Sequence, residues 1–88
     1  MIETVVTIKN RAGMHTRPAS MIVKIAAKFK SDFYIVKDDY KINGKSIIGI
    51  MSLAAEYGSQ LTLTFDGPDE KKASEEMVKY FEDGFGET

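Results

Sequence analysis

The segment GMHTRPAS, residues 13–20, contains the single histidine of this chain, His15. The residues before it, 2–8, alternate with a period of two, which predicts a strand with one buried face. The residues after it, 19–29, place apolar side chains three and four positions apart, which predicts an amphipathic helix. His15 is therefore expected where a strand leads into a helix. The expected core stripe of that helix is Ala19, Ile22, Val23, Ala26 and Phe29.

A helix N-terminus exposes backbone N–H groups without partners and the positive end of the helix dipole, so it binds anions, phosphate above all. A neutral imidazole there has a ring nitrogen that can attack phosphorus. Arg17, two residues on, brings a guanidinium that can reach phosphate oxygens. Helix propensity places Pro18 first in the helix with Arg17 as its cap, whereas the anion-binding argument places the cap at His15. The residues predict a side chain that accepts and passes on a phosphoryl group.

The other possible roles of this histidine are a structural role, a hydrolytic triad and a metal site. A lone histidine is often a surface or structural residue. A hydrolytic triad would need a nucleophile turn between strand and helix, and the segment shows none. A metal site would need further ligands, and the chain has no second histidine.

Length and composition predict one globular domain, residues 1–88. The net charge of −1, from 12 basic and 13 acidic residues, gives no reason to expect nucleic-acid binding, since such domains are usually strongly basic. The absence of cysteine excludes disulfides and thiolate chemistry. No apolar run approaches the ~18 residues of a membrane span, and Glu3, Thr4 and Thr7 interrupt any signal sequence. We therefore expect a cytoplasmic protein without membrane insertion.

The rest of the chain continues the alternation of elements. Strands are predicted over residues 32–37, 40–42 and 60–66. A last helix follows the turn at Gly67-Pro68 and stops at Gly84, which leaves residues 85–88 as a loose tail. The order β-α-β-β-α-β-α predicts an α+β fold, with helices covering one face of a four-stranded, mostly antiparallel sheet.

A short helix over residues 46–55, with Ser46 as its N-cap, is apolar nearly all the way round. Ile50 and Leu53 are the expected core residues. A short surface helix cannot bury every face, so the remaining apolar residues are expected to form an exposed patch that fits a partner surface; these are Ile47, Ile48 and Met51. A fully buried helix is the alternative.

Two segments resemble the signatures of HPr, the histidine-containing phosphocarrier family of the phosphoenolpyruvate-dependent sugar phosphotransferase system (PTS). Residues 13–19 resemble its active-site signature, and residues 43–51 resemble its second signature, around a regulatory serine. The resemblance covers nearly the whole chain and implies an open-faced β-sandwich. It also implies a carrier that is modified covalently, rather than an enzyme, with no cofactor or metal.

The resemblance implies a role for each matching residue. His15 would accept phosphate on Nδ1 from phosphorylated enzyme I, which phosphoenolpyruvate charges, and pass it to enzyme IIA components. Arg17 would stabilise the phosphate, within a phosphate-binding region of Thr16, Arg17 and Pro18. Ser46 would be phosphorylated by HPr kinase/phosphorylase, with a transcriptional regulator as a further partner. The expected docking residues are Lys24, Ile47, Ile48 and Met51, on a protein expected to be a monomer.

Three positions depart from the family pattern. Thr16 stands where alanine is common, Met14 replaces isoleucine or leucine, and Gly44 precedes Lys45 where an apolar residue is frequent. They bear on partner choice more than on chemistry. One alternative is a regulatory paralogue, of the nitrogen type or controlled through Ser46, without sugar transport.

A small α+β nucleic-acid-binding module is a more distant alternative. It would need a basic sheet face with exposed aromatic residues. The outward residues of the 60–66 strand are Gln60, Thr62 and Thr64, and they do not supply such a face.

Overall fold

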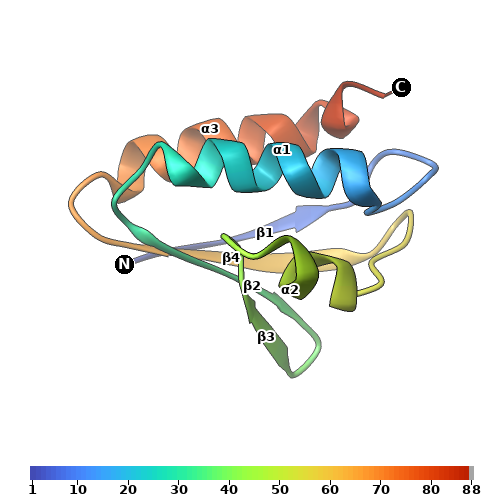
Figure 1. Cartoon of the computed structure of the whole chain (residues 1–88), viewed down its shortest axis with the longest axis horizontal. Helices are drawn as coiled ribbons and strands as arrows, with labels where there is room; N and C mark the ends of the chain where they lie inside the picture. The colour runs from blue at the N-terminus through green and yellow to red at the C-terminus, as the bar shows by residue number, and fades with distance from the viewer. Residues whose placement is uncertain (88) are drawn as a thin grey trace.

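Four strands form one antiparallel sheet in the order β1-β4-β2-β3 in a computed structural model that describes residues 1–87. The elements in chain order are β1 Ile2–Thr7, α1 Thr16–Ala27, β2 Asp32–Lys37, β3 Tyr40–Asn43, α2 Ile47–Ser52, β4 Gln60–Asp66 and α3 Glu70–Glu82, then a 3-10 turn at Gly84–Gly86. Helices α1 and α3 lie side by side over one face of the sheet, and α2 packs beside α1 and β3 (Figure 1). This is the open-faced α+β fold that the sequence predicts.

The core lies between the sheet and the helices. Strand β4 pairs with both β1 and β2, so its inward side chains meet partners on either side: Leu61 faces Val6, and Leu63 faces Ile35. Phe33 and Phe65 stack with their ring centroids 4.8 Å apart. All six of these side chains are buried, as the period-two pattern predicts.

The first helix begins earlier than its apolar stripe predicts. It starts at Thr16 rather than Ala19, with His15 as its N-cap. Pro18 is then the third helical residue, where the N–H that proline lacks would have no partner inside the helix. The cap position required by the anion-binding argument is therefore confirmed, and the position favoured by propensity is wrong.

The second helix is shorter than predicted and ends at Ser52, not near residue 55. Ala54 adopts a left-handed backbone conformation, with φ of 49°, which cannot continue a right-handed helix. Ile50 and Leu53 are buried as predicted.

The chain after α3 is ordered, against the expectation of a loose tail. Gly84 and Gly86 have positive φ angles, so the chain folds back on itself. Phe85 is buried, with its ring centroid 5.0 Å from that of Phe81 and 5.1 Å from that of Tyr80. This turn carries Glu87 toward the N-terminal end of α1 (Figure 1). Thr88 lies outside the described residues. Within residues 1–87, none of the helices has both the length and the apolar composition needed to cross a bilayer.

Candidate functional site

The loop before His15 is fixed to the segment that joins α2 and β4. The Met14 N–H donates to the Ala55 carbonyl at 2.9 Å, and Asn10 Nδ2 donates to the Gly13 carbonyl at 2.8 Å. Gly13 has a φ of 72°, and a Cβ at this position would lie 2.9 Å from the Ala55 oxygen. Only glycine fits this close approach without strain. The loop therefore delivers His15 to the helix in a fixed position.

His15 caps α1 through its backbone. Its extended conformation, with φ of −128°, lets its carbonyl accept the Ala19 N–H at 3.0 Å. Pro18 has no N–H, and the hydrogen bonds among residues 1–87 give no partner to the N–H groups of Thr16 and Arg17. Two backbone donors and the positive helix end thus face outward beside the imidazole, an arrangement that can bind a phosphoryl group. Thr16 and Arg17 are exposed, whereas Pro18 is buried.

The Glu87 carboxylate connects the side chains of Asn10, His15 and Arg17. Its Oε2 lies 2.8 Å from His15 Nε2 and accepts hydrogen bonds from Arg17 Nη2 at 2.7 Å and Nε at 3.2 Å. Its Oε1 accepts from Asn10 Nδ2 at 2.7 Å. The Glu87 side chain is only 10% exposed, compared with 38% for His15 and 75% for Arg17. A carboxylate from the far end of the chain therefore sits against the imidazole.

Hydrogen bonds keep this carboxylate ionised. The hydrogen bond from Arg17, with smaller contributions from Asn10 and His15, lowers the pKa of Glu87 although desolvation acts in the opposite direction. In return, Glu87 raises the pKa of Arg17, mainly through the same hydrogen bond. Nearby, burial raises the pKa of Tyr80, and the Glu87 charge adds to that effect. At neutral pH the site holds a guanidinium and a carboxylate in direct contact.

Neither Asn10 nor Glu87 is among the site residues predicted from the sequence. Glu87 is separated from His15 by 72 positions, and no local spacing relates the two. The pair of glycines around Phe85 is the one signal that the chain reverses there. An acidic residue directly after such a turn is a candidate for contact with a distant element.

The second motif forms α2. The Ser46 hydroxyl accepts a hydrogen bond from the Gly49 N–H at 3.0 Å, so Ser46 is the predicted N-cap. Ile48 is 83% exposed and Ile47 is 40% exposed. Met51, by contrast, is half-buried and packs against the core, so it is less exposed than the sequence predicts. On α1, Lys24 is exposed.

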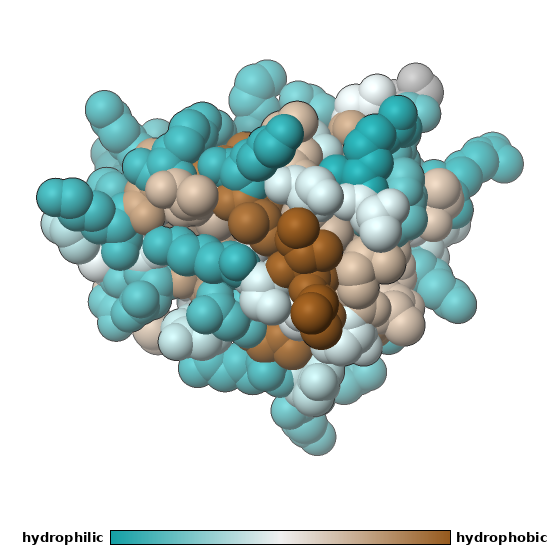
Figure 2. All heavy atoms as spheres, in the orientation of Figure 1, coloured by the Kyte–Doolittle hydropathy of each residue, from teal (hydrophilic) through white to brown (hydrophobic). Residues whose placement is uncertain are grey.

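Hydrophobic side chains form a band across α1 and α2 on the face shown in Figure 2. Ile47 and Ile48, which we call the apolar patch, are exposed on α2, and Met21 is exposed on α1. Exposed apolar residues gathered in this way are typical of a contact surface for another protein.

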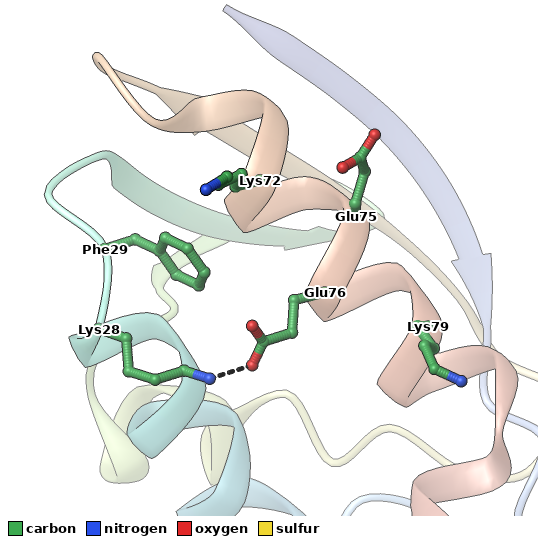
Figure 3. A pocket seen from close by; sticks show the side chains of 6 residues that line it. All are labelled: Lys28, Phe29, Lys72, Glu75, Glu76 and Lys79. Atoms are coloured by element: carbon green, nitrogen blue, oxygen red, sulfur yellow. Dashed lines mark hydrogen bonds and ion pairs between the residues drawn. The ribbon is translucent and has the colours of Figure 1, made fainter.

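A separate hollow lies between α3 and the C-terminal end of α1 (Figure 3). It is lined by Lys28, Phe29, Lys72, Glu75, Glu76 and Lys79. Lys28 and Glu76 form an ion pair across it. Charged side chains of both signs line it, and the length of α1, about 18 Å, separates this hollow from His15. It is not part of the site.

The family model described as "PTS HPr component phosphorylation site" matches residues 2–83. This chain belongs to the HPr family. HPr of Treponema pallidum is 42% identical over 87 residues, which are 99% of this chain and 99% of that protein. The HPr-like protein Crh of Halalkalibacterium halodurans is 43% identical over 82 residues, 93% of this chain and 98% of that protein.

Solved HPr structures agree with the fold. The crystal structure of HPr from Thermoanaerobacter tengcongensis has a TM-score of 0.95 and 43% identity, covering 100% of this chain and 99% of that one. The structure of HPr from Bacillus anthracis has a TM-score of 0.86 and 39% identity, covering 91% and 95%. As a member of the HPr family, this chain is a phosphocarrier protein and not an enzyme.

Proposed function

We propose that this protein accepts a phosphoryl group on His15 Nδ1 from phosphorylated enzyme I and passes it to enzyme IIA components of the PTS in the cytoplasm. The observation that carries the proposal is the position of His15 at the N-cap of α1, beside the free N–H groups of Thr16 and Arg17. These donors can bind the phosphate oxygens while the ring nitrogen holds phosphorus. The Arg17 side chain supplies a further positive charge.

The site suits transfer in both directions. Its exposed donors stabilise phosphate charge without enclosing the group, so an acceptor can approach the phosphorus from solvent. The apolar patch and Lys24 offer apolar anchors with a basic residue for transient docking on an acidic partner. Three matched structures are described as dimers, one of an HPr from T. tengcongensis and two of Crh. We propose that the transferring form of this chain is a monomer, because both partners must reach the same face.

A regulatory role through Ser46 is the second candidate. Two HPr-like Crh proteins, 43% and 39% identical, are among the relatives, and Ser46 occupies the cap of α2 beside the apolar patch. A phosphate on Ser46 would place about two negative charges on the proposed docking face. The responsible kinase would be HPr kinase/phosphorylase, and a transcriptional regulator would be the reader of the modified form.

The test is incubation with phosphoenolpyruvate and enzyme I, followed by mass measurement before and after acid treatment. We expect one added phosphoryl group that acid removes, since phosphohistidine is acid-labile and phosphoserine is not. His15→Ala should not be labelled, whereas Ser46→Ala should be labelled like the unmodified chain. Acid-labile phosphate on His15→Ala would refute the proposal. Acid-stable labelling with ATP and HPr kinase/phosphorylase, lost in Ser46→Ala, would support the regulatory role.

A further inference from the structure

We propose that Glu87 is a positioning residue for phosphoryl transfer, which holds the His15 ring with its proton on Nε2 and leaves Nδ1 free to attack. The inference rests on the proposed function of His15. It assigns a role to a carboxylate that lies outside both sequence motifs and outside residues 2–83, the range that the family model matches.

The contact geometry carries this assignment. An ionised carboxylate can only accept hydrogen bonds, so the 2.8 Å contact between Glu87 Oε2 and His15 Nε2 requires a proton on Nε2. The hydrogen bonds among residues 1–87 include none to Nδ1. A neutral ring bound in this way therefore presents its lone pair at Nδ1. Carboxylates that bind the second nitrogen of a histidine fix its tautomer and orientation in the same manner in metal sites and hydrolases.

Glu87 is itself held in place. Asn10, which is 1% exposed, donates to the Gly13 carbonyl and to Glu87 Oε1 from the same nitrogen. The Gly13 contact belongs to the loop that delivers His15, so one amide side chain links the loop to the C-terminal turn. Buried Phe85, which packs against Phe81, anchors this C-terminal turn. A carboxylate that is 10% exposed and tethered from two sides is built into the site.

The charges in the transfer step balance with this proton in place. The Nδ1 lone pair forms a bond to phosphorus, the bond between phosphorus and the donor atom breaks, and its electron pair stays on the donor. The ring keeps its Nε2 proton and gains positive charge, which lies 2.8 Å from the Glu87 oxygen. Glu87 is thus expected to stabilise the phosphorylated ring and the transition state leading to it.

Glu87 also binds Arg17, so its two contacts must be separated experimentally. The test compares Glu87→Gln, which removes the charge, with Glu87→Asp, which retains it. Glu75→Gln is the matched control, because it removes one exposed acidic charge from α3 near the far end of α1. Single-turnover phosphorylation by enzyme I is measured for each, alone and in an Arg17→Ala background. Ring ¹⁵N chemical shifts of His15 are recorded at pH 8, above the ordinary imidazole range.

We expect the proton on Nε2 in the unmodified chain, and a mixture of tautomers in Glu87→Gln. Phosphorylation of Glu87→Gln should slow on the order of 10-fold or more. Glu87→Asp should recover part of the rate, and Glu75→Gln should match the unmodified chain. The Glu87→Gln effect should persist in the Arg17→Ala background. A proton on Nδ1 in the unmodified chain, unchanged rates in Glu87→Gln, or an effect that vanishes without Arg17 would overturn the inference.

These outcomes remain distinct from failure of the proposed function. If the unmodified chain takes no phosphate on His15, the proposed function fails. If it is phosphorylated normally and Glu87→Gln is equally fast, only the role of Glu87 fails. The tautomer measurement on the unmodified chain keeps the inference testable if a Glu87 variant does not fold.

Discussion

The hydroxyl of Ser46 accepts a hydrogen bond from the Gly49 N–H at 3.0 Å, so the residue proposed for regulatory phosphorylation also caps α2. Three substitutions separate the two roles. Ser46→Ala should lower the free energy of unfolding by about 1 kcal/mol, because the cap is lost. Ser46→Asn and Ser46→Asp should stay close to the unmodified chain, because both side chains cap helices well. Denaturant unfolding measures all three.

The negative charge alone should affect docking. Ser46→Asp is expected to slow phosphorylation of His15 by enzyme I, and the deficit should shrink at high salt because screening shortens the reach of the charge. The neutral Ser46→Asn is the control. Stopped-flow rates at two salt concentrations test this, and equal slowing by Asn and Asp would assign the effect to shape instead of charge.

Ile48 tests the apolar patch. Its side chain is 83% exposed, so Ile48→Glu should leave the thermal midpoint nearly unchanged. Loss of an apolar anchor should slow transfer from enzyme I by roughly 10-fold, equivalent to about 1.4 kcal/mol. Val5→Glu is the matched control, since Val5 is also exposed but lies on the uncovered face of the sheet. Similar slowing by both variants would place the docking surface elsewhere. Met51 is less suitable because it packs against the core.

Arg17→Ala should slow phosphoryl transfer by about 10- to 100-fold, the effect of losing one charge-assisted hydrogen bond to the phosphate. Arg17→Lys should recover only part of the rate because lysine lacks the planar fork. The fold should be unaffected, since the side chain is 75% exposed. The pKa of Glu87 should rise toward its ordinary value in Arg17→Ala, because Arg17 is the main cause of its lowering. A ¹³C titration of the carboxyl measures it, and an unchanged pKa would contradict the observed contact.

Gly13 and Gly58 form a matched pair. Both have positive φ angles, but a Cβ on Gly13 meets the Ala55 carbonyl at 2.9 Å, whereas a Cβ on Gly58 meets nothing within 4 Å. Gly58→Ala should destabilise the protein by about 1–2 kcal/mol through backbone strain alone. Gly13→Ala should destabilise it further and also slow phosphorylation, because the loop that carries His15 must shift. Equal losses of stability would mean that the loop accommodates the added methyl group.

Asp69 should set much of the acid sensitivity of the fold. Its carboxylate accepts hydrogen bonds from the Ser31 hydroxyl at 2.5 Å and from the N–H groups of Lys30 and Ser31. These bonds, the Ser31 hydroxyl first, lower the pKa of Asp69 below its usual value. The stabilisation is therefore complete above pH ~4, the ordinary aspartate range, and is lost as pH falls through the lowered pKa.

Asp69→Asn should reduce stability at pH 7 and flatten the decline of stability below about pH 4. Thermal unfolding across that range, compared with Glu75→Gln, measures the effect. If the stability of Asp69→Asn falls with decreasing pH as steeply as that of the unmodified chain, other carboxylates cause the acid sensitivity.

Local sequence patterns correctly predicted the features that depend on neighbouring residues, namely strand bounds and a helix cap. The strands over 32–37 and 60–66 have their predicted bounds because their side chains alternate strictly across a sheet. Ser46 caps α2 because its hydroxyl meets an N–H three residues away. The predictions that failed depend on contacts between residues far apart in the sequence. Met51 is partly covered by packing that helix periodicity cannot reveal, and Glu87 reaches His15 only because buried Phe85 folds the chain back.

The order of the strands in the sheet delays the pairing of β1 during folding. Strand β1, residues 2–7, has a single neighbour in the sheet, β4, which begins at residue 60. At translation rates of about 5–20 residues per second, the first strand waits several seconds before its partner exists. Pairing over such a sequence separation is also entropically costly and slow. We therefore expect β1 to dock late, and a nascent chain to be most vulnerable to aggregation while this strand is unpaired.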